Sequence, residues 1–196
     1  MNSSFRIILA SNSPRRKALL KAIGLNFSTI TISCEENYPD NLPISKIATF
    51  LAEKKAEHAD PQLIDQSTIL ITADTIVVAK GKVLGKPENR GEAMEMLQLL
   101  SGCAHQVFTG VCIVFKGEKI LLSDVTTVYF RQLTSGEMTY YTDHYKPFDK
   151  AGAYGIQEWI GMIGIEKIEG TYFNVMGLPV NKVYDVLRKN GVFEAF

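Results

Sequence analysis

Short apolar runs rich in β-branched residues alternate along this chain with segments of helical periodicity. In the first half the spacing predicts strands at Phe5–Ala10, Leu25–Ser33 and Thr68–Ala79, and helices from Pro14 to Gly24 and over Pro43–Ala59. Ser13 is a favourable N-cap for the first of these helices, and Gly24 suits its C-terminal end. Alternation of this kind is typical of an α/β fold.

The second half continues the alternation and adds a hairpin. We expect helices at Arg90–Leu100, Thr134–Thr142 and Pro179–Lys189, strands at His105–Phe115, Lys119–Arg131 and Ile165–Glu169, and a glycine-rich stretch over Ala151–Gly164. Gly117 lies between the two long strands, as in an antiparallel hairpin. Without a linker or repeat, the sequence predicts one domain over residues 1–196, built on a mixed sheet.

Composition and charge exclude several classes of protein. The 196 residues hold 21 Lys and Arg against 21 Asp and Glu, so there is no global field to attract nucleic acid or a membrane surface. Apolar residues make up 46%, which excludes disorder. The three scattered cysteines and three histidines lack metal-ligand spacing, and no apolar run reaches the roughly 18 residues of a membrane helix. We expect a cytoplasmic globular protein that binds any anion through a few placed cations.

The segment Ser11–Arg16 (SNSPRR) is a candidate phosphate-binding loop. It lies between a predicted strand and a predicted helix, where backbone N–H groups and the helix dipole favour an anion. Ser11 and Ser13 can donate hydroxyl hydrogen bonds, and Arg15 and Arg16 can bind phosphate through two hydrogen bonds each. A plain N-cap followed by two solvated arginines fits the same residues.

Asp74 interrupts the apolar run TILITADTIVVA with a carboxylate. An unpaired buried charge is costly, so Asp74 should meet a metal, a cation or several donors, or lie at the mouth of the strand. Ligands gather at strand ends in α/β sheets, which favours a catalytic or metal-binding role over a structural salt bridge. The hydroxyl of Thr75 could assist.

Four weaker signals accompany these two. Glu35 and Glu36 follow a strand and could supply hard-metal ligands, and Lys54 and Lys55 lie on the Pro43–Ala59 helix; solvated loops and helix faces account for both pairs equally well. In Gly85-Lys86-Pro87, a lysine lies between glycine and proline, which favour a turn. The block DKAGAYGIQ ends in Gln157, whose side-chain amide follows glycines that allow a close approach of the backbone.

Taken together, these segments resemble the Maf family of nucleoside triphosphate pyrophosphatases. The matching segments run in family order over nearly the whole chain: LASNSPRR at 9–16, EE at 35–36, AEKKA at 52–56, ADTIVV at 73–78, GKP at 85–87, LSG at 100–102, TGV at 109–111, DKAGAYGIQ at 149–157 and YFNVMGLP at 172–179. Each segment alone is weak evidence, whereas the ordered set is specific.

The resemblance implies an elongated mixed sheet with flanking helices and two lobes around a deep, ITPase-like cleft. It implies that water attacks the α-phosphorus of a nucleoside triphosphate, with Mg²⁺ or Mn²⁺, to give the monophosphate and pyrophosphate. The block ending in Gln157 resembles the branch acting on dTTP and UTP, with modified pyrimidine nucleotides as further candidates, rather than the 7-methyl-GTP branch. The family is associated with housecleaning of nucleotide pools, arrest of division and a homodimer.

The resemblance also assigns roles to residues. Asp74 becomes the proton acceptor for the attacking water or a metal ligand, and Glu36 a second metal ligand, with Glu35 an open alternative. The triphosphate contacts are Arg15, Lys55 and Lys86, completed by Ser11, Ser13 and Arg16, and the base-selective positions are Arg15, Thr75 and Gln157. Lys54 is an open alternative to Lys55. A different class of function, a non-catalytic nucleotide sensor controlling septum formation, would use the same residues for binding alone.

Overall fold

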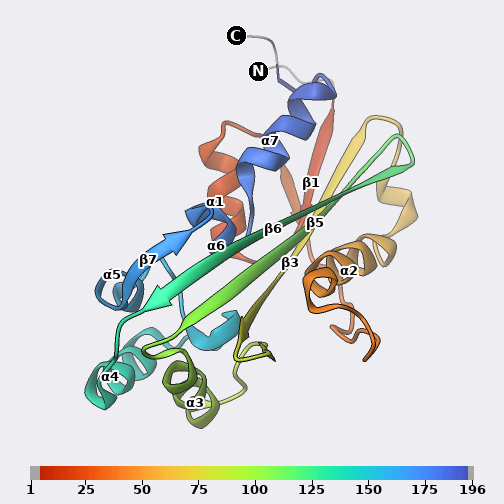
Figure 1. Ribbon diagram of the computed structural model, residues 1–196. Helices are drawn as coiled ribbons and strands as arrows, with labels where there is room; N and C mark the ends of the chain where they lie inside the picture. Colours follow the sequence, from red (N-terminus) through yellow and green to blue (C-terminus); the bar gives the residue numbers. More distant parts are fainter. Residues whose placement is uncertain (1–4, 194–196) are drawn as a thin grey trace. The chain divides into compact units, whose positions relative to one another are not determined.

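A seven-stranded mixed β-sheet organises the chain in the computed structural model, which describes residues 5–193 (Figure 1). The strands are β1 (Arg6–Ala10), β2 (Ser28–Ile30), β3 (Thr68–Ala79), β4 (Lys82–Leu84), β5 (Ala104–Phe115), β6 (Glu118–Phe130) and β7 (Ile165–Glu169). Neighbouring strands follow the order β2-β1-β3-β5-β6-β7, with β4 paired to β3. β1 is parallel to β2 and β3, whereas β4 and β7 pair antiparallel, which confirms the predicted α/β fold with a mixed sheet.

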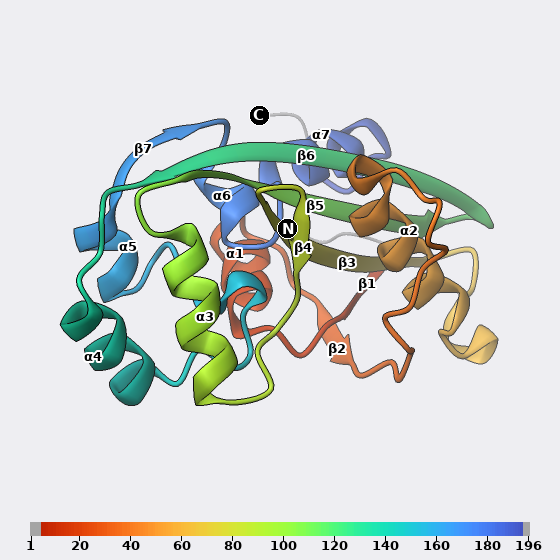
Figure 2. The ribbon, with the colours of Figure 1, turned by 60° about the horizontal axis from the view of Figure 1, so that its bottom comes forward.

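Helices fill the connections between these strands. They are α1 (Pro14–Ala22), α2 (Ile44–Glu57), the 3₁₀ turn η1 (Pro61–Leu63), α3 (Arg90–Leu100), α4 (Ser135–Tyr145), η2 (Ala151–Ala153), α5 (Trp159–Gly164), α6 (Tyr172–Val175) and α7 (Val180–Lys189). Figure 2 shows α3 and α4 side by side. Within residues 5–193, no helix combines the length and the apolar character that a membrane span requires.

Two tight turns connect consecutive strands. Lys116 and Gly117 both have positive φ, 51° and 82°, between β5 and β6. Lys80 and Gly81, at 50° and 75°, do the same between β3 and β4. Two central residues with positive φ are typical of a type I′ turn, whose twist matches that of the strands. The hairpin predicted around Gly117 is confirmed, and the second hairpin has the same cause.

Strand β2 is shorter than the sequence pattern predicts. Alternation suggested a strand over Leu25–Ser33, but only Ser28–Ile30 pairs, in register with Ile8–Ala10 of β1. β2 lies at the end of the sheet and has β1 as its neighbour. Because β1 ends at Ala10, the residues after Ile30 have no strand to pair with, and alternation alone cannot show this.

The glycine-rich stretch contains more structure than expected. Residues 151–164 hold η2 and the helix α5, and two short elements that the pattern missed are β4 and α6. Gly161 in α5 lies so close to the backbone of Ile156 that a Cβ would meet its carbonyl oxygen at 2.1 Å. Glycine at this position serves a close approach between segments and does not mark a loop.

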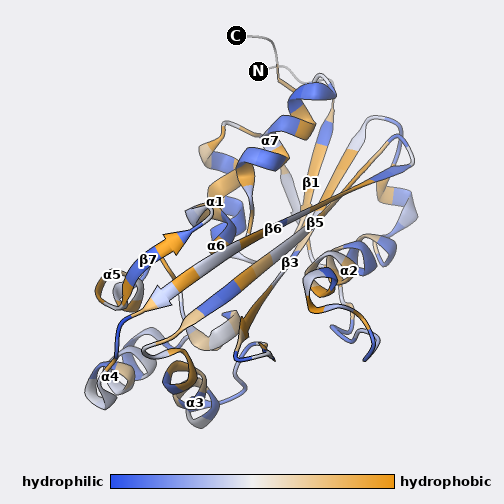
Figure 3. Cartoon of the chain, viewed as in Figure 1, coloured by the Kyte–Doolittle hydropathy of each residue, from blue (hydrophilic) through white to orange (hydrophobic). Residues whose placement is uncertain are grey.

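The chain divides into two compact units, and each has its own core. The first comprises the described residues up to Asp74, Thr109–Asp124 and those from Gly177 onward; the second comprises Thr75–Phe108 and Val125–Met176. The divisions fall within β3, β5 and β6 and before α7. Figure 3 shows apolar residues along most of β1 and β3 and alternation along α7. The single domain and the deep cleft of the sequence analysis stay predictions.

In the first unit, α2 packs unusually close to β5. A Cβ on Gly110 would lie 2.3 Å from the backbone of Ala48 and Thr49, so this contact requires glycine. The buried hydroxyl of Thr72 in β3 donates to the carbonyl oxygen of Ala52, at 2.6 Å. These contacts fix the helix against the sheet and therefore fix the position of every side chain that α2 presents.

Candidate active site

The loop after β1 enters α1 through a side-chain cap. Ser13 Oγ accepts from the backbone N–H of Arg16 at 3.4 Å, and Pro14 occupies the first helical position. The backbone N–H of Ser13 in turn donates to Ser11 Oγ, at 3.2 Å. The two hydroxyls that sequence analysis selected as phosphate ligands therefore also shape the loop, and Arg15 lies half-buried beside them.

Arg16 ties this loop to two distant segments. Its guanidinium donates to the carbonyl oxygens of Gly177, at 2.7 Å, and of Ala73, at 2.8 Å. Ala73 directly precedes Asp74, so the loop and the carboxylate are held together. Burial lowers the pKa of Arg16, the charges of Asp74 and Glu36 raise it, and that of Arg15 lowers it. Arg16 thus lies in the field of both proposed acidic residues.

Asp74 is buried and lies where β3 continues beyond the end of β1. The parallel pairing runs to Ala10 and Thr72, so Asp74 is two residues past the last paired position. The carboxyl ends of parallel strands are where α/β sheets bind ligands. Asp74 is 6% exposed, which confirms the burial expected from its apolar surroundings.

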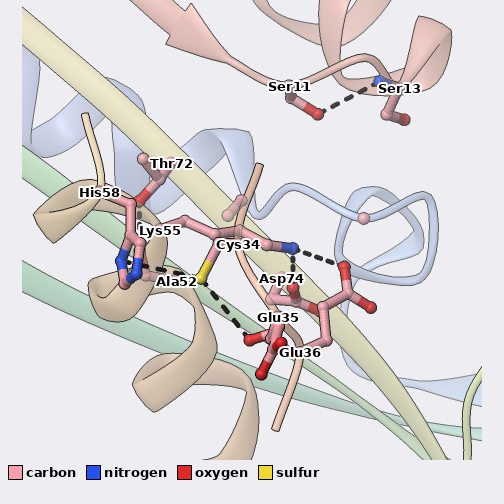
Figure 4. A network of polar contacts seen from close by, with 12 residues as sticks. Ser11, Ser13, Cys34, Glu35, Glu36, Ala52, Lys55, His58, Thr72 and Asp74 are labelled. Atoms are coloured by element: carbon pink, nitrogen blue, oxygen red, sulfur yellow. Dashed lines mark hydrogen bonds and ion pairs between the residues drawn. The ribbon is translucent and has the colours of Figure 1, made fainter. Parts of the chain in front are cut away.

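Lys55 of α2 joins Asp74 to Glu36 (Figure 4). Its Nζ atom donates to Asp74 Oδ2 and, at 2.9 Å, to Glu36 Oε1. The lysine side chain is 16% exposed, and those of Asp74 and Glu36 are 9% and 45% exposed. Burial alone would lower the Lys55 pKa, but the charges and hydrogen bonds of the two carboxylates outweigh it and raise the pKa. The ammonium group is held charged between two carboxylates.

The neighbouring acidic and basic residues form a separate group around Asn37. Lys54 Nζ donates to the backbone carbonyl oxygen of Asn37, at 3.2 Å, and to its side-chain oxygen. Asn37 Nδ2 donates to Glu35 Oε2 at 3.0 Å. The structure therefore brings Glu36 and Lys55 to Asp74, and turns Glu35 and Lys54 toward Asn37. The sequence alone does not decide which of the two glutamates and which of the two lysines face Asp74.

The donor set around Lys55 suits a divalent cation. Glu36 and Asp74 direct carboxylate oxygens at one position, which the ammonium group holds in this structure. Mg²⁺ is commonly bound by one or two carboxylates, with the remaining positions filled by water and substrate phosphate. Among the described residues, no group of three or more His, Cys, Asp or Glu could hold a metal. Two carboxylates therefore fit a metal ion whose remaining ligands come from water and the phosphate groups of a substrate.

The second unit contains the remaining candidates on two contacting segments. The N–H of Gly152 donates to the carbonyl oxygen of Gly85 at 3.0 Å, which joins the GKP turn to the DKAGAYGIQ block. Gly152 has φ of +69°, and a Cβ there would lie about 3.0 Å from Val77 Cγ1. The exposed Lys86 follows directly after Gly85. Thr75, half-buried, is the first residue of this unit.

Gln157 is half-buried, with one end of its amide enclosed. Its Oε1 atom is buried and has no hydrogen-bond partner among the described residues. Gln157 also lines an open cavity of about 380 Å³ together with Met162, Lys167 and Tyr172. That volume falls in the range of small-molecule sites, which run from about 300 to 1,000 Å³.

Several residues that hold the site together carry no signal in the sequence pattern. Asn37 separates the two Glu–Lys pairs, yet it reads as an ordinary loop residue. Tyr141 of α4 hydrogen-bonds to Glu158, next to Gln157, and lies in a helix with no recognisable motif. Such contacts join residues far apart in sequence, so only the fold can show them.

The fold and these side chains define an α/β protein in which a lysine meets one buried and one exposed carboxylate, beside the carboxyl end of a parallel strand. A family model described as Maf-like protein matches residues 6–190, so the chain belongs to the Maf-like family. It is 50% identical to the dTTP/UTP pyrophosphatase of Bacteroides fragilis over 94% of this chain and 96% of that protein. Similar proteins of the same name are found in Parabacteroides distasonis (50% identical, over 94% of this chain and 95% of that protein) and Cytophaga hutchinsonii (49%, over 93% and 83%).

Proposed function

We propose that this protein is a nucleoside triphosphate pyrophosphatase that hydrolyses dTTP and UTP to the monophosphate and pyrophosphate. The observation that carries the proposal is the convergence of Asp74 and Glu36 on Lys55. Half of the residues are identical to those of proteins named dTTP/UTP pyrophosphatase, over nearly the whole chain, which supports the choice of substrate.

The chain's own residues can carry out the proton transfer and charge stabilisation. In the proposal Asp74 accepts the proton of the water that attacks the α-phosphorus, because its carboxylate is buried just past the carboxyl end of β1, next to the Arg16 contact with Ala73. Negative charge develops on the departing pyrophosphate, and fixed cations stabilise such charge best where water is excluded. Lys55, Lys86 and Arg15 have this role, and Ser11, Ser13 and Arg16 complete the phosphate-binding loop.

The proposal includes Mg²⁺ or Mn²⁺ as cofactor. Glu36 and Asp74 would hold the ion, because their oxygens already face one cation position. When bound, such an ion supplies Lewis-acid stabilisation of charge on the phosphate oxygens. Lys55 would then be released from the two carboxylates and could contact the substrate.

Gln157 reads the base in this proposal. A glutamine amide can hydrogen-bond the edge of a pyrimidine, and Gln157 lines the cavity of the second unit. Arg15 and Thr75 are the other positions that the family resemblance connects with base selectivity. Modified pyrimidine nucleotides belong to the same proposal. A homodimer and a cytoplasmic location, which the resemblance also implies, complete it; light scattering of the purified protein tests the dimer.

The test is pyrophosphate release from dTTP, UTP, GTP and 7-methyl-GTP in the presence of Mg²⁺. We expect release from dTTP and UTP, at a far higher rate than from the two purine nucleotides. The Asp74→Asn variant, assayed in parallel, distinguishes the protein's own activity from a contaminating phosphatase.

The same assay separates the enzyme from a non-catalytic sensor. A sensor would bind dTTP in equilibrium dialysis and release no pyrophosphate from any nucleotide, and that result would overturn the proposal. Release from the purine nucleotides alone would overturn the assignment of Gln157 to the base while leaving the reaction in place.

A further inference from the structure

A buried polar cluster lies directly beside Gln157 in the second unit. Lys150 Nζ contacts Glu158 Oε1 at 3.1 Å and Asp149 Oδ1 at 2.6 Å. The hydroxyl of Tyr141, a side chain with 0% exposure, donates to Glu158 Oε2. The same hydroxyl accepts the backbone N–H of Gly155 at 3.1 Å. We refer to Tyr141, Lys150 and Glu158 as the Tyr141 cluster.

The Tyr141 cluster and the Gln157 amide both lie next to Gly155. A Cβ on Gly155 would lie 2.9 Å from Gln157 Nε2 and 3.0 Å from Glu158 Oε2. The amide and the carboxylate therefore share the space that the missing side chain of Gly155 leaves. The Tyr141 hydroxyl forms hydrogen bonds on both sides of Gln157, with the backbone of Gly155 and with the side chain of Glu158. The segment that carries the amide is therefore held at two points.

Holding the Gln157 amide in this position has an energetic cost. An enclosed carbonyl oxygen without a hydrogen bond is unfavourable, because its hydration is lost and nothing replaces it. Oε1 of Gln157 is in this state among the described residues. A conformation of this kind persists only where surrounding contacts enforce it, and such positions concentrate at functional sites. The Tyr141 cluster holds the residues on either side of Gln157, namely Gly155 and Glu158, and its buried lysine–carboxylate pair resists rearrangement.

We propose that the Tyr141 cluster holds the Gln157 amide in one orientation and thereby sets the preference for thymine and uracil over cytosine. The inference rests on the proposed function and makes Tyr141, Lys150 and Glu158 positioning residues. With Oε1 enclosed, Nε2 is the group that remains for a ligand. Thymine and uracil present a carbonyl oxygen at position 4, which accepts from an amide N–H, whereas cytosine presents an amino group there.

A rotated amide would reverse this preference. Turning the Gln157 side-chain amide by half a turn exchanges Oε1 and Nε2, so that the atom left for a ligand would accept a hydrogen bond from the amino group of cytosine. Glutamine is therefore selective only while its amide cannot rotate. A loosened cluster should lower the ratio of kcat/KM for dTTP to that for dCTP, whereas a general loss of structure should reduce both activities together.

The test compares two substitutions in α4. Tyr141→Phe removes the hydroxyl that bonds Glu158 and Gly155. Tyr145→Phe is the matched control, because Tyr145 stacks on Tyr141 with ring centroids 5.0 Å apart and its hydroxyl bonds to none of residues 5–193. We expect Tyr141→Phe to lower the dTTP/dCTP ratio at least fivefold, and Tyr145→Phe to leave it within twofold of the parent value.

A second pair of variants covers the case in which Tyr141→Phe fails to fold. Glu158→Gln keeps an oxygen for the Tyr141 hydroxyl, whereas Glu158→Ala removes it. We expect the ratio to fall for Glu158→Ala and to be largely rescued in Glu158→Gln. A ratio that is unchanged in folded Tyr141→Phe or Glu158→Ala overturns the inference. Absence of pyrophosphate release by the parent protein contradicts instead the proposed function, so the two failures are distinguishable.

Discussion

Each unit of this protein contains a lysine held between two carboxylates: Lys55, which is partly exposed, and Lys150, which is buried. The two groups differ in the other residues that contact them. Lys55 lies between Asp74 and Glu36, with carboxylate side chains 9% and 45% exposed. Lys150 lies between Glu158 and Asp149, at 20% and 54%. The Lys150 group is completed by a fully buried phenol and a backbone N–H. The two carboxylates of the Lys55 group also interact electrostatically with the guanidinium group of Arg16.

This difference suggests that the Lys55 group can exchange its ion pairs for a ligand, whereas the Lys150 group keeps them. A phenol and a backbone amide are neutral and fixed, so the Lys150 group gains nothing by opening. The Lys55 group consists of charges, and one of its carboxylates, that of Glu36, is exposed. In the proposed function a nucleotide with its metal would replace these internal ion pairs. We therefore expect substitutions to affect mainly turnover in the first group and mainly stability and selectivity in the second.

The largest expected effect is that of Asp74→Asn. Loss of a positioned proton acceptor should lower kcat for dTTP by about 10²–10⁴-fold. The far-UV circular dichroism spectrum should be unchanged, because asparagine fills the same space and still accepts from Lys55. Near-normal turnover would assign Asp74 a structural role and make Glu36 the better candidate for proton acceptor.

Lys150→Met should have the next largest effect, on stability. Removing the ammonium group leaves the Glu158 carboxylate without its cation, and breaking a buried pair in this way costs about 3–5 kcal/mol. Urea unfolding followed by fluorescence measures the loss. Lys167→Met is the control in the same unit: Lys167 pairs with Glu169 at 2.5 Å on the surface, and its loss should not change the free energy of unfolding measurably. If Lys150→Met and Lys167→Met lowered the free energy of unfolding equally, the buried ion pair would not stabilise the protein more than the exposed one.

The second unit should also lose stability in mild acid because of His105. This side chain is 2% exposed, and burial lowers its pKa to about 4. An unfolded histidine has a pKa of about 6.5, so the unfolded chain binds the extra proton first as the pH falls. The contribution of His105 is therefore complete above pH 6.5, declines below it and is lost at pH 4.

Between pH 6.5 and pH 5 the resulting loss should be about 2 kcal/mol in the free energy of unfolding. Urea midpoints across this window measure it, and His105→Phe should flatten the profile. A parent protein whose stability does not change from pH 6.5 to pH 5 would show that His105 is accessible to protons.

The smallest effect should come from two neighbouring glutamates. Glu36→Gln removes a charged oxygen from the proposed metal position, and we expect the Mg²⁺ concentration for half-maximal activity to rise about tenfold. Glu35→Gln should leave it unchanged, because Glu35 accepts from Asn37. The reverse result would exchange the two residues in the site.

The strong elements were predictable because local chemistry determines them. The bounds of β3, α3 and β7 match the predicted ranges. A long β-branched run marks β3 and helical periodicity marks α3, so the sequence leaves little choice in these two. Asp74 was predictable as a buried charge needing a partner, because its apolar neighbours cannot provide one. The residues alone made Lys54 and Lys55 a weak candidate pair; the family resemblance assigned the phosphate contact to Lys55 and kept Lys54 as an alternative.

The rest depends on long-range pairing. β2 is short because its partner ends at Ala10, and Glu36 rather than Glu35 meets Lys55 because Asn37 takes the other pair. Neither fact follows from a window of neighbouring residues. The Tyr141 cluster is the clearest case, since it joins α4 to the segment before α5 through a hydroxyl that no periodicity reports.

The hydrogen bond from Arg16 to the carbonyl oxygen of Gly177 has a consequence for synthesis of the protein. The first unit is assembled from the early part of the chain, the middle of β5 and β6, and the residues from Gly177 onward. On the ribosome, Arg16 must wait for about 160 further residues before this acceptor emerges. The loop Ser11–Arg16 is therefore among the last parts of the first unit to reach its final form, because one of the contacts that hold it forms only after Gly177 has been made.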